Sequence, residues 1–165
     1  MIEGVVMTLG RDINTDLITP TKHLSGHSSD AERLRYTLYD YDPEFGVKYK
    51  PGIILVTDSN FGCGSARESA PLAFKQLGVP AIISESFARI FYRTSINIGL
   101  PIFELSGAIK MFKDGDTARV EPETGVITNV TTGETATIPP MPPEMRKIIA
   151  MGGLIAYTEH MLKEG

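Results

Sequence analysis

The sequence predicts a mixed α/β fold that combines a parallel core sheet with a small antiparallel β-meander. Short apolar runs alternate with helical stretches between residues 52 and 105. Short alternating runs separated by tight turns follow between residues 114 and 138, and helical stretches close the chain. Alternation of strand and helix favours parallel strands joined by right-handed crossovers. Alternating runs joined by turns are typical of a meander.

The expected strands are short apolar or alternating runs bounded by turn residues. In chain order they cover residues 3–10, 52–57, 81–83, 101–105, 118–121, 126–130 and 135–138. The run over residues 52–57 is rich in β-branched residues, which indicates a buried strand. Turns at residues 123–125 and 131–134 separate the last three strands, so these three are expected to form the meander.

The expected helices lie between and after these strands. In chain order they cover residues 30–36, 69–77, 87–91, 144–150 and 154–158. Proline is tolerated only in the first turn of a helix, so Pro71 places the start of the second helix near Ser69. Ser86 is expected to be the N-cap of the third helix. The Met and Leu side chains of the last two helices are expected in the core.

Polar segments separate several of these elements. Residues 11–16 are rich in Asp and Asn and predict a turn, in which Asp12 and Asn14 make side-chain-to-backbone hydrogen bonds. Residues 28–49 predict a surface excursion that is partly mobile until a partner docks. The proline-rich residues 139–143 predict an extended connector.

Composition limits the class of protein and its partners. A length of 165 residues without internal repeats indicates a single domain over residues 1–165. The formal net charge is −4 and no basic run is present, so nucleic acid is not an expected partner. The sequence shows no signal peptide and no apolar run long enough for a membrane, and its one cysteine cannot form an internal disulfide. A reducing cytoplasm is therefore the expected location.

The chemistry is expected in the loop that follows the buried strand at residues 52–57. This loop runs from Gly62 to Arg67 and contains two glycines, a serine and an arginine. Glycine lets another molecule approach the main chain closely, and free N–H groups at the start of the next helix favour an anion. Ser65 and Arg67 are expected to project into the same small volume. The loop is therefore predicted to hold a carboxylate and to act on it.

Other interpretations of this loop stay open at this point. The loop can be a turn without another role, or Ser65-x-x-Glu68 can be a capping box that makes Ser65 structural. A dinucleotide fingerprint fits less well, because Arg67 stands where a third small residue is needed. Cys63 is a further candidate, as a nucleophile whose thiol pKa is lowered by the start of the helix.

Two features bear on metal and anion binding. An iron–sulfur cluster normally takes several thiolates, whereas the sequence has one cysteine, and His23, His27 and His160 show no ligand spacing. By itself the chain is expected to bind no metal. Arg89 and Arg93 are four residues apart and share one face if their helix continues. One of them can lean toward the loop, and a solvated or ion-paired arginine is the alternative.

Several stretches together resemble a known family. Residues 60–68 (NFGCGSARE) resemble the swivel-domain signature of the aconitase superfamily, and residues 86–93 and 97–101 continue it in order. Residues 12–20 resemble the family's N-terminal element. The resemblance covers most of the chain from residue 3 to about residue 105, and the length is similar to that of the superfamily's free-standing small subunits. It implies a three-layer β/β/α swivel domain, which agrees with the fold predicted above.

The resemblance also implies a reaction and the residues that perform it. Family members reversibly remove water from a malate-type acid and rehydrate the neighbouring carbon. By position, Ser65 matches the catalytic base, Arg67 the carboxylate-binding residue beside it and Asp16 an acid in the active-site wall. Substrate contacts are implied for Gly64, Ser65, Ala66, Arg67, Thr21, Lys22 and His23. Thr21, Lys22 and His23 belong to residues 21–25, which the resemblance places beside the variable side group of the substrate. Ala66 replaces the second serine of many relatives, which implies the loss of a secondary hydrogen bond.

The resemblance finally implies partners. The family's Lewis acid is an iron of a 4Fe–4S cluster, so a large subunit is expected to carry the cluster that this chain lacks the ligands to hold. The implied substrate is a small di- or tricarboxylic acid, isopropylmalate of leucine biosynthesis first, with homoaconitate or a methyl-substituted malate as alternatives. A carboxylate-binding module without catalysis is the alternative of another class. Whether the isolated chain pairs with itself stays open.

Overall fold

The computed structural model describes residues 1–24, 26 and 29–164. Within these residues, seven strands form one mixed sheet. In chain order they are β1 (Ile2–Leu9), β2 (Ile54–Thr57), β3 (Ile82–Ser84), β4 (Ile102–Glu104), β5 (Thr117–Glu121), β6 (Val126–Asn129) and β7 (Thr135–Thr137). Across the sheet the order is β4-β3-β2-β1-β5-β6-β7. Strands β1 to β4 pair in parallel, and β5 to β7 pair antiparallel.

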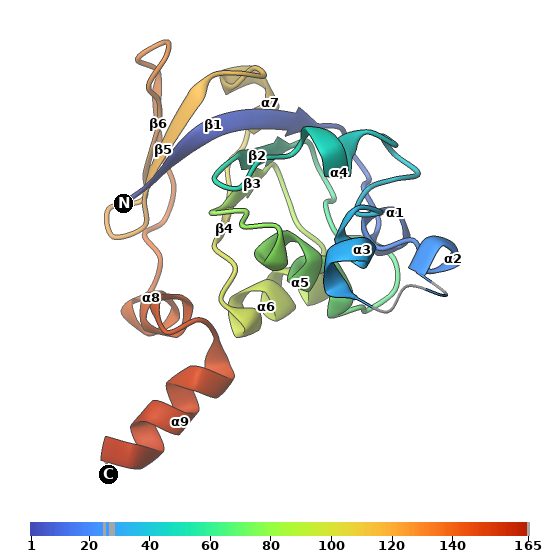
Figure 1. The fold of residues 1–165 in the computed structure, drawn as a ribbon. Coiled ribbons are helices and arrows are strands. Elements are labelled where there is room, and N and C mark those ends of the chain that lie inside the picture. Colours follow the sequence, from blue (N-terminus) through green and yellow to red (C-terminus); the bar gives the residue numbers. More distant parts are fainter. Residues whose placement is uncertain (25, 27–28, 165) are drawn as a thin grey trace.

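Strand β1 joins the two parts of this sheet. Its first half pairs antiparallel with β5, with Ile2 opposite Val120, and its second half pairs parallel with β2, with Val6 opposite Ile54. Figure 1 shows β1 as one long curved ribbon that spans both parts. The predicted combination of a parallel core sheet and a β-meander is confirmed, with β1 common to both.

The helices connect and cover the strands. In chain order they are α1 (Thr15–Ile18), α2 (Thr21–Leu24), α3 (Asp30–Leu34), α4 (Phe45–Lys48), α5 (Ser69–Gln76), α6 (Arg89–Ile98), α7 (Ala108–Met111), α8 (Pro143–Ala150) and α9 (Leu154–Glu164). Helices α5 and α6 lie side by side against the parallel strands, and α9 extends away from the body toward the C-terminus (Figure 1). None of the helices in the described residues is long and apolar enough to span a membrane.

The burial of the strands follows their position in the sheet. All residues of β2 and β3 are buried, as expected for parallel strands covered on both faces. Strands β5 and β6 instead alternate between buried and half-buried residues, which is typical of an antiparallel sheet with one face in the core. Side chains from both parts of the sheet belong to one hydrophobic cluster.

The expected surface excursion at residues 28–49 is wrong in part. Leu38, Phe45 and Tyr49 are buried in the main core, and α4, which was not predicted, carries Phe45. Helix α3 agrees with the weak helix predicted at residues 30–36. Polar and charged residues surround these apolar positions, and this composition led to the prediction of a surface segment. Ser28, where the predicted excursion begins, lies outside the described residues.

Ser86 is not the N-cap of α6. The helix begins at Arg89, and Ala88 occupies the cap position with extended backbone (ψ 137°) and no side-chain hydrogen bond. A parallel bridge between Phe61 and Phe87 keeps the chain extended past the serine. The Ser86 hydroxyl instead accepts a hydrogen bond from the backbone N–H of Asn60 (2.9 Å).

The Met and Leu side chains of the C-terminal helices are also placed differently from the prediction. Met145 packs partly against the core, but Met151, Leu154 and Met161 are exposed, and Leu162 has a relative exposure of 78%. Helix α9 extends away from the body (Figure 1), so little of its apolar surface meets another element. The two C-terminal helices are thus found where the sequence predicts them, and the predicted burial of their Met and Leu side chains is wrong for most of these residues.

Candidate active site

The candidate site lies where the carboxyl ends of β1 and β2 meet. Because these strands are parallel, the turn after β1 and the loop after β2 leave the sheet at the same edge. Backbone hydrogen bonds then join turn and loop: Asp12 N to Ser59 O (3.0 Å), Gly62 N to Ile13 O (2.8 Å) and Thr15 N to Cys63 O (2.9 Å). Residues 12–15 and 59–63 therefore run side by side and form one unit.

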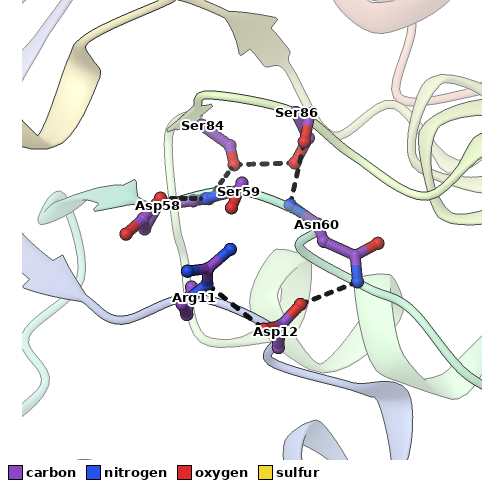
Figure 2. Close-up of polar contacts among 7 residues, drawn as sticks. All are labelled: Arg11, Asp12, Asp58, Ser59, Asn60, Ser84 and Ser86. Atoms are coloured by element: carbon purple, nitrogen blue, oxygen red, sulfur yellow. Dashed lines mark hydrogen bonds and ion pairs between the residues drawn. The ribbon is translucent and has the colours of Figure 1, made fainter.

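A polar network supports this unit from the side of β3. Figure 2 shows its members, Arg11, Asp12, Asp58, Ser59, Asn60, Ser84 and Ser86. The Asn60 amide donates to the Asp12 carboxylate (2.8 Å), which Arg11 also contacts (3.2 Å). The Ser84 hydroxyl donates to the Asp58 carbonyl (2.6 Å). The network thus connects the carboxyl ends of the neighbouring strands β1, β2 and β3 next to the loop.

The hydrogen bonds predicted for the turn are found in part. The Asn14 side chain accepts from the Leu17 backbone N–H (2.8 Å) and caps α1, as expected of an Asn in such a turn. Asp12 bonds to side chains rather than to backbone, and its own backbone is left-handed (φ 54°). A side-chain partner 48 residues away along the chain is beyond what a local pattern can reveal.

Two glycines shape the loop, as the sequence predicted. Gly62 and Gly64 have φ values of 77° and 89°, which side chains rarely adopt. At Gly62 the space is also closed, because a Cβ atom there would lie 2.1 Å from Cγ of Phe91. The missing side chain thus lets the first turn of α6 pack directly on the loop.

Ser65, Arg67 and Asp16 gather at the outer end of the loop. Nη2 of Arg67 lies 2.7 Å from Oδ1 of Asp16, so the turn after β1 and the loop after β2 also meet through an ion pair. Ser65 is exposed, and its carbonyl accepts a hydrogen bond from the Thr15 hydroxyl (2.8 Å). Thr15 was not among the predicted site residues, although it directly precedes Asp16 in the matching stretch.

The capping-box interpretation of Ser65 is wrong. Helix α5 begins at Ser69 with Glu68 in the cap position, and no side chain makes the cap hydrogen bond. Pro71 occupies the first turn as predicted. The Ser65 hydroxyl therefore does not cap α5.

A pocket of about 310 Å³ opens between the loop and α6. It is lined by Thr15, Gly62, Gly64, Ser65, Ala66, Arg67, Ala88, Arg89, Ile90, Phe91 and Thr94. The structure thus brings the predicted loop residues Gly64 to Arg67 to one cavity, and Asp16, which does not line the cavity, is paired with Arg67. Ile90 and Thr94 line the same cavity and were not predicted as site residues, although Ile90 lies within the matching residues 86–93 and Thr94 directly follows them.

Thr21, Lys22 and His23 lie on α2 and do not line this pocket. Lys22 and His23 both contact the Asp40 carboxylate at 3.0 Å. Hydrogen bonds from His23 and Lys22 hold the pKa of Asp40 below its ordinary value. The His23 ring stacks on Tyr36 with centroids 5.5 Å apart. Ser25, at the end of the predicted segment, lies outside the described residues, and substrate contact by this segment stays a prediction.

Cys63 does not have the lowered pKa expected for a nucleophile at a helix start. Burial raises the pKa of the Cys63 thiol, and the negative charge of Asp12 raises it further. The thiol is partly buried between turn and loop, where Cys63 pairs with Asn14 in a parallel bridge. In the part of the chain that the structure describes, no three His, Cys, Asp or Glu side chains gather as a metal ion would require.

Comparison with known proteins identifies the family of this chain. Residues 14–106 match the family model of the aconitase C-terminal domain, and the chain belongs to this family. Within it, the chain is similar over its whole length to small subunits of 3-isopropylmalate dehydratase. It is 47% identical to that of Heliobacterium modesticaldum over 162 residues, which are 98% of this chain and 97% of the relative. The corresponding subunit of Moorella thermoacetica is 45% identical over 99% of this chain and 98% of its own.

Two proteins from one further organism extend the comparison. The isopropylmalate/citramalate isomerase small subunit of Methanocaldococcus jannaschii is 42% identical over 99% of this chain and 97% of its own length. A crystal structure of 3-isopropylmalate dehydratase from the same organism superposes with a TM-score of 0.88 at 34% identity and covers 99% of both chains. This agreement confirms the fold class and the family that the sequence motifs indicated.

Proposed function

We infer that this chain is the small subunit of a 3-isopropylmalate dehydratase. The enzyme interconverts 2-isopropylmalate and 3-isopropylmalate through 2-isopropylmaleate, by removal and renewed addition of water, in leucine biosynthesis. Full-length similarity to small subunits of that name supports this inference. We also propose the cytoplasm as its location, since the chain has one cysteine and gains nothing from an oxidising compartment.

The observation that supports a catalytic role for this chain is the exposed Ser65 hydroxyl beside the Arg67–Asp16 pair. We propose that Ser65 is the base that takes the proton from the carbon next to a substrate carboxylate. A serine hydroxyl is a weak base unless its alkoxide is stabilised. The loop N–H groups, the uncapped start of α5 and the Arg67 guanidinium supply that stabilisation.

We propose that Arg67 binds a substrate carboxylate and that Asp16 orients it. A guanidinium has five N–H donors in a planar fork, so the contact to Asp16 at 2.7 Å leaves others for a bidentate grip. Asp16 does not itself line the pocket, and in this proposal it acts only through its contact with the guanidinium.

The family also implies a 4Fe–4S cluster, and the described residues of this chain do not fit it. Cys63 is the one thiol of the sequence, and no cluster of ligand side chains is found among the described residues. We therefore propose that a large subunit brings the cluster. In this proposal the small subunit contributes the base and the carboxylate-binding cation, and the active site is complete only when both chains meet.

Reconstitution tests this function. The chain is mixed with a cluster-bearing large subunit under anaerobic conditions, and the hydration of 2-isopropylmaleate is followed. Activity is expected from the mixture and from neither part alone. Activity of the isolated small subunit would contradict the division of the site. A chain that binds small acids tightly but activates no large subunit would instead support the carboxylate-binding module.

A methyl-substituted malate is the second candidate substrate. It is favoured by the relative whose name includes citramalate, which is 42% identical over nearly the whole chain. The kcat/KM values of the reconstituted enzyme for isopropylmalate, citramalate and homoaconitate decide between these substrates. The highest value identifies the side group that the pocket accepts.

A further inference from the structure

The turn after β1 contains one buried polar residue to which the proposed function gives no role. Thr15 is the first residue of α1, has a relative exposure of 2% and lines the pocket together with Ser65. We propose that Thr15 is a positioning residue, whose hydroxyl holds the loop in the conformation that presents Ser65 to the substrate. This inference rests on the proposed function, because Thr15 would act on catalysis only through the proposed base.

Thr15 contacts the loop on both sides of Gly64. Its backbone N–H donates to the Cys63 carbonyl (2.9 Å), and its hydroxyl donates to the Ser65 carbonyl (2.8 Å). One peptide unit, from Gly64 to Ser65, lies between the two units whose carbonyls are held. Because peptide units are planar, the bond to the Ser65 carbonyl also fixes the direction of the next N–H, that of Ala66. Thr15 thus limits the directions in which the Ser65 side chain can leave the backbone.

The hydroxyl of Thr15 is available for this bond because of its place in the helix. Within a helix, a threonine hydroxyl often donates to the carbonyl three or four residues earlier. Asn14 caps α1 and Thr15 is the first helical residue, so no preceding turn of α1 offers such a carbonyl. A buried hydroxyl requires a hydrogen-bond partner. The loop supplies it in the Ser65 carbonyl.

The start of α1 and the loop also lie in close contact. A Cβ atom on Gly64 would lie 3.4 Å from Cβ of Asn14 and 3.6 Å from Oγ1 of Thr15. These are van der Waals distances, so the backbone at Gly64 packs directly on the start of the helix. Both hydrogen bonds of Thr15 are made within this chain, and its own neighbours bury the side chain. The contact therefore does not depend on a second subunit.

Consecutive residues of α1 hold two different parts of the loop. Thr15 binds the Ser65 carbonyl, and Asp16 pairs with the Arg67 guanidinium across 2.7 Å. One turn of helix therefore sets the position of the proposed base relative to the proposed carboxylate-binding cation. A displacement of about 1 Å in such a pair can lower the rate about 10²-fold. The Thr15 hydroxyl is thus expected to affect the chemical step more than substrate binding.

Matched threonine variants test this role in the reconstituted enzyme. Thr15→Val removes the hydroxyl and keeps the shape of the side chain, whereas Thr15→Ser keeps the hydroxyl. Thr15→Val should lower kcat about 10- to 100-fold and change KM less than about threefold, and Thr15→Ser should restore kcat to within about threefold of wild type. The control is Thr57→Val, which removes a buried hydroxyl bonded to the Asp58 carbonyl (3.3 Å) outside the pocket. Circular dichroism verifies that each variant folds.

A double variant tests whether Thr15 acts through Ser65. In the Ser65→Ala background, Thr15→Val should change kcat less than about twofold, because the side chain that it positions is gone. If Thr15→Val lowered kcat by the same factor in both backgrounds, the two residues would act independently. That result would overturn the inference.

Alkylation of Cys63 by iodoacetamide in the isolated chain separates this inference from the proposed function, because it needs no turnover. Cys63 is the one thiol of the sequence and is partly buried, and Thr15 holds its carbonyl. Thr15→Val should open the loop more often and raise the alkylation rate about threefold or more at fixed pH. Thr15→Ala, which removes the hydroxyl without adding a methyl group, should do the same. Thr15→Ser and Thr57→Val should react at the wild-type rate.

These rates and the kinetics have distinct meanings. Wild-type alkylation rates in both Thr15→Val and Thr15→Ala would overturn the inference. So would a raised alkylation rate with normal kcat, since catalysis would then not require the held loop. An inactive wild-type mixture would count against the proposed function alone, and the alkylation rates would still decide whether the Thr15 hydroxyl holds the loop.

Discussion

The Asn60 side chain donates a hydrogen bond to the Asp12 carboxylate across 2.8 Å, and both residues have left-handed backbone, with φ values of 62° and 54°. Non-glycine residues in this conformation cost about 1–3 kcal/mol each, and Asn and Asp tolerate it best. The bond joins two strained positions (Figure 2), one in the turn after β1 and one in the loop after β2. It keeps the turn and the loop in the register in which Asp16 meets Arg67.

Asn60→Ala should therefore destabilise the protein. The variant loses a hydrogen bond worth about 1 kcal/mol and keeps the left-handed backbone. Asn60→Gly loses the same bond but relieves the strain, so it should retain about 1 kcal/mol more stability than the alanine variant. Urea unfolding measures both free energies. Equal losses in the two variants would show that position 60 is not strained.

Gly62→Ala should be more damaging than a left-handed glycine elsewhere. Its Cβ would lie 2.1 Å from the Phe91 ring, whereas the Cβ of Gly133→Ala would meet nothing within 4 Å at a similar φ of 81°. Both variants bear the backbone strain, and only the first must also move α6. Thermal and urea unfolding should show an extra loss of about 1–3 kcal/mol for Gly62→Ala. A difference near zero would mean that α6 shifts without cost.

Ser65→Ala should lower kcat of the reconstituted enzyme by about 10²- to 10⁴-fold, because the proposed base is removed. The KM and the melting temperature should change little, since the side chain is exposed and caps no helix. Ser106→Ala, which alters another exposed serine outside the pocket, is the control. Normal turnover by Ser65→Ala would remove this residue from the mechanism.

Arg67→Lys should raise the KM about 10- to 100-fold although the charge is kept. Lysine has a single ammonium and cannot hold Asp16 and a substrate carboxylate through one planar fork. Steady-state kinetics of the reconstituted enzyme measure the change. A wild-type KM in the lysine variant would show that a point charge is sufficient there.

Cys63 should react slowly with iodoacetamide at pH 8, because the thiolate is the reactive form and the folded protein raises the pKa of this thiol. The rate should rise only as the pH passes above the ordinary cysteine pKa. Asp12→Asn keeps an acceptor for Asn60 and removes the negative charge, so it should move the rate curve to lower pH. Asp30→Asn, on the exposed helix α3, is the control. If the rate curve of Asp12→Asn were not shifted along the pH axis, burial alone would account for the raised pKa of the Cys63 thiol.

Much of this molecule follows from local sequence patterns. The buried strand β2, the glycine loop and the Pro71 position each have one local physical cause, so the strand, the loop and the start of α5 were found with little error. The motifs then placed Ser65, Arg67 and Asp16 together, and the structure brings Arg67 and Asp16 to 2.7 Å.

Contacts between distant segments were not predictable in this way. Ser86 has the residue type of an N-cap, but the bridge from Phe61 to Phe87 overrides that preference. The burial of Leu38 and Phe45 and the exposure of Leu162 depend on which surfaces the rest of the fold covers. The local spacing of apolar residues contains no information about this. The Asn60–Asp12 bond depends on parallel strands that bring two distant loops to one edge.

The dual pairing of β1 has a consequence for how the protein is made. During synthesis Val6 can find Ile54 once the first third of the chain has left the ribosome, but Ile2 must wait for Val120. Until then the leading half of β1 is an open edge that can pair with another nascent chain. Fusion tags at the N-terminus that hinder this late closure should therefore lower the soluble yield more than tags at the end of α9.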